Sequence, residues 1–288
     1  MEKKAPVEKI SDAKKQRVSF RMLMIGDVMG KAGRDILVQR IAAIKDKFDV
    51  DFVVVNAENA AGGAGLTPEI FNAIIRAGVD CVTLGDHAYD QKSLYPVLNS
   101  NETRLVRPIN LPPDAPGKGW TVLEASAKEG RPALRVAVVA ALGRVFMREM
   151  GDNPLVALDK VLEKIADVQI RLLDFHAEAT SETQTIGRYL DGKFSAVLGT
   201  HTHVPTADEE IFPNGTAFQC DVGMTGSFES IIGRRLDVVF ENMKTCKRTT
   251  FEVASKDARL CGTLVDVDAV SGKATAIRRL VVKENDEL

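Results

Sequence analysis

The side chains best suited to bind a metal ion stand at the ends of apolar segments, and this placement suggests one shared site. They are carboxylates, an amide and imidazoles: Asp27, Glu58 and Asn59, Asp86 and His87, His176, and His201 and His203. The chain has four histidines, and each stands at the end of an apolar run. In open α/β sheets, ligands bind beyond the carboxyl ends of the strands. If the runs are neighbouring parallel strands, we expect these side chains to converge on one rim.

Each segment is ambiguous by itself, and the prediction depends on their agreement. An aspartate after a strand is common in turns, and a lone histidine more often makes a packing hydrogen bond. His201 and His203 are two residues apart, so an extended backbone would direct both imidazoles to the same side. Five separate segments that all end in suitable donors are hard to explain as coincidence.

The donor types indicate which metals the site would take. Oxygen and imidazole donors without a thiolate suit iron or manganese, with zinc as an alternative. Two metal ions about 3.5–4 Å apart can bind a hydroxide and a phosphoryl oxygen together. The donors are too many for one tetrahedral zinc ion and suit two ions that share a bridging carboxylate: Asp27, Glu58, Asn59, Asp86, His176, His201 and His203.

The elements that position these residues alternate between strands and helices. We expect strands at residues 19–25, 51–55 and 81–84, a helix at 33–48, and a helix from Thr67 and Pro68 to Gly78. Threonine followed by proline is typical of a helix start, and alternation of this kind indicates a parallel sheet. In the second half we expect a hairpin around residues 128–132, helices at 153–166 and 181–190, strands at 168–175 and 195–198, and antiparallel strands within 249–283.

Composition excludes several classes of protein. The chain has 288 residues, of which 45% are hydrophobic and 27% are charged, as in soluble globular proteins. Its longest apolar run, 136–142, has seven residues, whereas a membrane helix needs about 20. The net charge of −2 gives no basic surface for general nucleic-acid binding.

Residues 1–19 hold six basic and three acidic residues and no apolar core of a secretory signal, so we expect a mobile tail. We expect one domain over residues 20–288. The four cysteines, Cys81, Cys220, Cys246 and Cys261, are scattered, which is typical of reduced thiols in a cytoplasmic protein. The sequence leaves the oligomeric state open, a homo-oligomer included.

Five ordered motifs resemble those of the YmdB-like bacterial metallophosphoesterases, a branch of the calcineurin-like superfamily. The similarity runs from about Met22 to the C-terminal strands. The motifs are Gly26-Asp27, Asn56-Ala57-Glu58-Asn59-Ala60-Ala61, Gly85-Asp86-His87, the run 174–182 (Asp-Phe-His-Ala-Glu-Ala-Thr-Ser-Glu) and Gly199-Thr200-His201-Thr202-His203-Val204.

The resemblance implies a four-layer α/β/β/α sandwich with a dinuclear centre, and phosphodiesterase activity on cyclic nucleotides such as 2′,3′-cyclic AMP. Asp27 and His203, with Asn59 nearby, would hold one metal ion, and Glu58 would bridge to the second. The residues implied to hold the second ion are Asp86, His176 and His201. A metal-bridging hydroxide would attack the phosphorus, and His87 would protonate the leaving oxygen.

One position departs from the family pattern, which commonly reads Gly-Asn-His where this chain has Gly85-Asp86-His87. The carboxylate is still an oxygen donor but adds a negative charge to the site. A metal-bound regulator that senses nucleotides with weak or no catalysis is therefore the alternative function. The other substrates left open are 3′,5′-cyclic nucleotides and further phosphodiesters.

Overall fold

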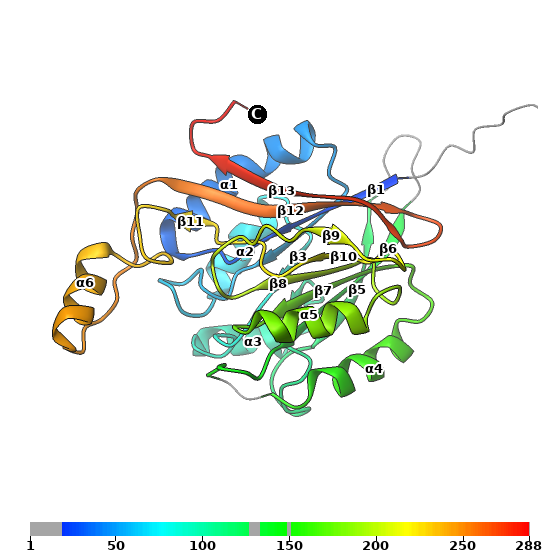
Figure 1. Cartoon of the computed structure of the whole chain (residues 1–288), viewed down its shortest axis with the longest axis horizontal. Helices are drawn as coiled ribbons and strands as arrows, with labels where there is room; N and C mark the ends of the chain where they lie inside the picture. The colour runs from blue at the N-terminus through cyan, green and yellow to red at the C-terminus, as the bar shows by residue number, and fades with distance from the viewer. Residues whose placement is uncertain (1–18, 127–132, 149–150, 288) are drawn as a thin grey trace, which may run out of the picture.

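The computed structural model describes residues 19–126, 133–148 and 151–287. In these residues two β-sheets stack face to face, and helices cover the outer face of each (Figure 1). The arrangement is the expected four-layer α/β/β/α sandwich. The predicted hairpin turn around 128–132 lies outside the described residues, as does the predicted tail over residues 1–19 apart from Ser19, which opens the first strand.

The first sheet contains β1 (Ser19–Ile25), β2 (Phe52–Asn56), β3 (Cys81–Thr83), β4 (Leu105–Val106), β11 (Gly226–Ser227), β12 (Ala258–Asp268) and β13 (Ala274–Lys283). Its order is β11-β12-β1-β2-β3-β4, with β13 paired to β12. β1 to β4 are parallel, whereas β12 is antiparallel to β1, β11 and β13. The residues that follow β1, β2 and β3 therefore meet at one edge.

The second sheet contains β5 (Trp120–Ala125), β6 (Leu134–Leu142), β7 (Ile170–His176), β8 (Ala196–Thr200), β9 (Glu210–Ile211) and β10 (Ala217–Gln219). Its order is β5-β6-β7-β8-β10-β9, and β6, β7, β8 and β10 are parallel. In this register His176 pairs with Thr200, so the ends of β7 and β8 are level.

Three hydrophobic clusters separate the four layers. β1 shows the pattern: Met22 and Met24 enter the cluster between the sheets, whereas Leu23 and Ile25 enter the cluster under the helices, as expected from the period-two geometry of a strand. The helices on the first sheet are α1 (Gly30–Lys47) and α2 (Pro68–Arg76), with η1 (Lys92–Leu94) and α3 (Tyr95–Leu98) nearby. Those on the second sheet are α4 (Pro154–Lys164) and α5 (Thr180–Tyr189).

Several predicted elements are confirmed, and some details are wrong. Thr67 caps α2 and Asn153 caps α4, each through its side chain. β1, β2 and β3 are parallel neighbours and β12 and β13 pair antiparallel, as predicted. The strand expected from residue 249 begins instead at Ala258. Helix α6 (Leu236–Thr245) was not predicted; it contains no buried residue and stands away from both sheets (Figure 1). Across the described residues, every helix is too short or too polar to cross a lipid bilayer.

Candidate metal centre

The predicted donors come from both sheets. Asp27 follows β1, Glu58 and Asn59 follow β2, and Asp86 follows β3 in the first sheet; His176 ends β7, and His201 and His203 follow β8 in the second. The prediction assumed neighbouring parallel strands of one sheet. Instead, the carboxyl ends of two stacked sheets meet, and each sheet contributes about half of the donors.

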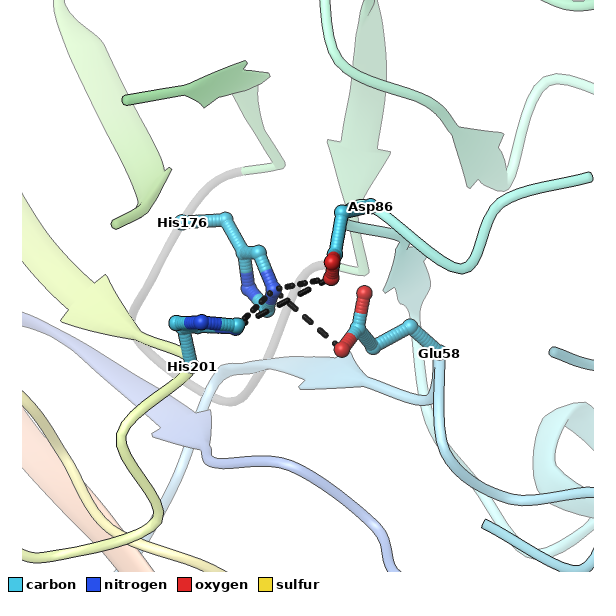
Figure 2. Close-up of side chains that lie close together, drawn as sticks. All are labelled: Glu58, Asp86, His176 and His201. Atoms are coloured by element: carbon cyan, nitrogen blue, oxygen red, sulfur yellow. Dashed lines mark hydrogen bonds and ion pairs between the residues drawn. The ribbon is translucent and has the colours of Figure 1, made fainter. Parts of the chain in front are cut away.

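Four of the donors form a compact group at this meeting point. One ligand atom from each of Glu58, Asp86, His176 and His201 lies within 4.8 Å of all the others (Figure 2). The Nε2 atom of His176 is at the centre. It lies 3.2 Å from Glu58 Oε1, 3.2 Å from Asp86 Oδ1 and 3.0 Å from His201 Nδ1.

The other three predicted donors form a second group next to Glu58. Asn59 Nδ2 donates to Glu58 Oε1 at 2.9 Å and lies 3.3 Å from His203 Nε2. His203 Nε2 is 4.0 Å from Asp27 Oδ1. Glu58 therefore stands between two groups of donors. For Asn59 to offer its oxygen to a cation its amide must turn over, because its nitrogen faces these neighbours.

An unpartnered oxygen supports the fit of this site to a cation. Asp27 is fully buried, and its Oδ1 has no hydrogen-bond partner within the described part of the chain. Leaving a buried acceptor unpaired costs about 1–3 kcal/mol, and a bound cation would satisfy it. The remaining oxygen, Oδ2, accepts a hydrogen bond from the backbone nitrogen of His201 at 3.0 Å.

The two histidines after β8 reach the site through a turn and not through an extended strand. His201 has φ 108° and His203 has φ 66°, conformations that non-glycine residues adopt rarely. The expectation that period-two geometry points both imidazoles the same way is thus wrong: His201 faces His176, whereas His203 faces Asn59. The Asp221 carboxylate holds this turn by accepting from the Thr202 nitrogen at 2.9 Å and hydroxyl at 2.8 Å.

Burial and the neighbouring carboxylates shift the pKa values of the donors in different directions. Burial raises the pKa of Asp27 well above its usual range. Burial opposes a charged imidazolium at His176, but the carboxylates of Glu58 and Asp86 outweigh that effect and raise its pKa well above its usual range. Burial lowers the pKa of His201 and of His203. Neutral imidazoles beside carboxylates are the form in which histidine binds metals.

His87 lies beside the donor group but is outside it. Its backbone nitrogen donates to Glu58 Oε2 at 3.2 Å, and its ring Nδ1 is 2.7 Å from Asp90 Oδ2. A carboxylate on Nδ1 orients the ring. Asp90 was missed in the sequence, although a carboxylate three residues after a histidine in a tight turn was an available signal.

A cavity of about 270 Å³ opens over the centre. Its walls include His87, His201 and His203 together with Glu178 and Arg234. Glu178 Oε2 lies 3.3 Å from the outer nitrogen of His201, Nε2, and the Arg234 guanidinium donates to the carbonyls of the glycine-rich loop at Gly62 and Gly63. Sequence reasoning gave neither residue a role, although Glu178 follows the end of β7 by two residues, as Glu58 follows β2.

Gly85 has no side chain, and this leaves room for the donors Glu58 and His176. A Cβ atom at this position would overlap Glu58 Oε2 and the ring of His176. We expect Gly85→Ala to displace both side chains, to destabilise the protein by about 1–3 kcal/mol, and to lower Mn²⁺ affinity by roughly tenfold or more. Denaturant unfolding and equilibrium dialysis with Mn²⁺ measure the two effects. A variant that binds Mn²⁺ as tightly as the wild type would contradict this packing.

Comparison with known proteins places the chain among bacterial relatives along nearly its whole length. The sequence profile described as YmdB-like protein matches residues 23–280. A Bacillus subtilis (strain 168) protein named 2′,3′-cyclic-nucleotide 2′-phosphodiesterase is 40% identical over 266 residues, which cover 92% of this chain and 98% of that protein.

Two crystal structures resemble the chain closely. A hypothetical protein from Thermus thermophilus superposes with a TM-score of 0.83 and 41% identity, and the match covers 92% of this chain and 100% of that one. A structure described as a novel phosphatase, from Mycoplasma pneumoniae, superposes with a TM-score of 0.84 and 34% identity, covering 93% of this chain and 95% of that one.

Proposed function

The chain belongs to the YmdB-like protein family, and we propose that it is a metal-dependent phosphodiesterase that hydrolyses 2′,3′-cyclic nucleotides at the centre described above. The name of the Bacillus subtilis relative supports this substrate class. A 3′,5′-cyclic nucleotide is the second substrate to assay, since the cavity walls alone do not select between the two esters.

The observation that carries the proposal is the convergence of the Glu58, Asp86, His176 and His201 ligand atoms within 4.8 Å of one another. Oxygen and imidazole nitrogen donors at this spacing suit divalent first-row metals. We propose iron or manganese, with zinc as the alternative, because no thiolate belongs to the donor group.

Each residue of the site has a proposed role. Asp27, Asn59 and His203 would hold one cation, and Glu58 would bridge to a second cation held by the remaining group: Asp86, His176 and His201. Two divalent cations supply an acidic bound water and neutralise the phosphate oxygens. His87, oriented by Asp90, would hold a proton at Nε2 for the leaving ribose oxygen.

The test is hydrolysis of 2′,3′-cyclic AMP by the purified protein, with Mn²⁺ and with EDTA, followed by chromatography of the products. We expect turnover with Mn²⁺ and loss of turnover with EDTA. Stoichiometric binding of the nucleotide without its consumption would favour the nucleotide-sensing regulator. The ratio of 2′- to 3′-phosphate product identifies which ester bond breaks.

Asp86 offers a test of how charge tunes the centre. With Asp27 and Glu58 it gives three negative charges against four positive charges on two divalent cations, whereas asparagine would leave two negative charges. We expect Asp86→Asn to weaken Mn²⁺ binding by roughly tenfold or more, equivalent to about 1.4 kcal/mol. We also expect it to raise turnover at saturating Mn²⁺, because a more positive centre acidifies bound water and attracts phosphate more strongly.

Titration of both proteins with Mn²⁺, followed by assays at saturation, separates affinity from turnover. Asp35→Asn is a matched control, because Asp35 pairs with Lys31 on the exposed surface of α1. Unchanged metal affinity and unchanged turnover in Asp86→Asn would show that this charge has no effect on the centre.

A further inference from the structure

A buried carboxylate lies directly beneath the donor group and takes no part in it. Asp174 is fully buried on β7, two residues before His176, so both side chains point to the same face of the strand. A charged side chain that is buried between two sheets requires hydrogen-bond partners, since burying an unpaired charge is costly.

Three neighbouring strands supply these partners. Asn56 Nδ2 on β2 donates to Asp174 Oδ2 at 3.0 Å, and Thr83 Oγ1 on β3 donates to the same oxygen at 2.5 Å. Thr200 Oγ1 on β8 donates to Asp174 Oδ1 at 2.7 Å. The first two strands belong to one sheet, and β8 belongs to the other, so this carboxylate joins the two sheets.

Each of these partners stands just before a proposed metal ligand in the chain. Asn56 precedes Glu58 by two residues and also accepts a hydrogen bond from its backbone nitrogen at 3.1 Å. Thr83 precedes Asp86 by three residues, and Thr200 directly precedes His201. The hydrogen bonds to Asp174 therefore lie close to the strand ends from which ligands of both sheets project.

The Thr200 hydroxyl also contacts His176. Its oxygen lies 2.8 Å from His176 Nδ1. A hydroxyl has one proton to donate, and the carboxylate of Asp174 takes it, so the oxygen accepts from Nδ1–H. His176 then directs its other ring nitrogen, Nε2, at Glu58 and Asp86. This Nε2 is the nitrogen at the centre of the donor group.

We propose that Asp174 and Thr200 are positioning residues of the metal centre. Together they hold the His176 ring with Nε2 directed at the cation, whereas the hydrogen bonds that Asn56 and Thr83 donate to Asp174 join the two sheets and stabilise the fold. Partners of this kind behind a histidine ligand commonly change metal affinity by about 10–100-fold when removed. The inference rests on the metal centre of the proposed function.

The test compares two threonines that donate to the same carboxylate. Thr200→Val removes the hydroxyl that contacts both Asp174 and His176. Thr83→Val removes a hydroxyl that contacts Asp174 but not His176. Both variants should lower the melting temperature of the metal-free protein. Only Thr200→Val should weaken Mn²⁺ binding by about 10–100-fold, and Thr200→Ser, which keeps the hydroxyl, should restore it to within a few-fold of the wild type.

Isothermal titration with Mn²⁺ gives the affinities, and thermal unfolding gives the melting temperatures. Equal Mn²⁺ affinities in Thr200→Val and Thr83→Val would overturn the inference and leave the proposed function standing. A wild-type protein that binds no Mn²⁺ would overturn both. If Thr200→Val does not fold, Thr200→Ala supplies the same comparison, because it also lacks the hydroxyl but adds no methyl group.

Discussion

Glu58→Gln is expected to lower the turnover of 2′,3′-cyclic AMP by about 10³-fold, equivalent to about 4 kcal/mol in the barrier. Glu58 lies between the two groups of donors, 3.2 Å from His176 Nε2 and 2.9 Å from Asn59 Nδ2. Glutamine keeps the size of the side chain and removes the charge that two cations would share. We also expect fewer metal ions per chain, which elemental analysis after dialysis measures.

Glu178→Gln is the matched control for this charge removal. Glu178 faces the same cavity and lies 3.3 Å from His201 Nε2, but its side chain is 49% exposed. Solvent weakens the effect of an exposed charge, so we expect a change in turnover smaller than about tenfold. A Glu58→Gln protein that retains two metal ions and full turnover would exclude the bridging role.

His87→Ala is expected to slow hydrolysis of 2′,3′-cyclic AMP by about 10²–10⁴-fold, the usual contribution of a general acid. The ribose alkoxide is a poor leaving group and needs a proton, whereas nitrophenolate leaves without one. The same variant should therefore hydrolyse bis(4-nitrophenyl) phosphate at close to the wild-type rate. Steady-state kinetics with both substrates measure this difference.

Asp90→Asn provides an intermediate case. It keeps His87 but replaces the carboxylate 2.7 Å from Nδ1 with a neutral amide, so the ring is held less firmly in its orientation. We expect a smaller loss than in His87→Ala, again confined to the alkoxide leaving group. Equal losses on both substrates would indicate that His87 supports the structure of the centre and does not donate the proton.

The strand ends that carry the donors could be predicted from the sequence, because an apolar run that ends in a polar residue is a local signal. β1, β2, β3, β7 and β8 all lie close to their expected positions. The pairing of strands into two mixed sheets depends on contacts between distant segments, such as β1 with β12, and periodicity does not report these. Strands of two or three residues, such as β4 and β10, are too short for any pattern.

Helix α6 was missed for a different reason. All ten of its residues, Leu236 to Thr245, are at least partly exposed. Its apolar residues nevertheless recur at the helical spacing i, i+3, i+4 and i+7, at Leu236, Val239, Phe240 and Met243. The signal for this helix was therefore present in the sequence, although the helix has no buried face.

The site was predicted as a set of donors, and its supporting residues were not. Asp174 and Thr200 both lie within the motifs that resemble the family, but the resemblance gave neither a role in the site, although an aspartate within the apolar run of β7 was a signal. The turn that separates His201 from His203 could not be foreseen, because it depends on hydrogen bonds to Asp27 and Asp221, which are distant in the sequence.

Anomalous X-ray diffraction from crystals grown with Mn²⁺ decides whether the centre holds two metal ions. We expect two peaks about 3.5–4 Å apart, one beside Asp27 and His203 and the other beside Asp86, His176 and His201, with Glu58 in contact with both. A single peak, or two peaks away from these residues, would exclude a dinuclear centre held by these side chains.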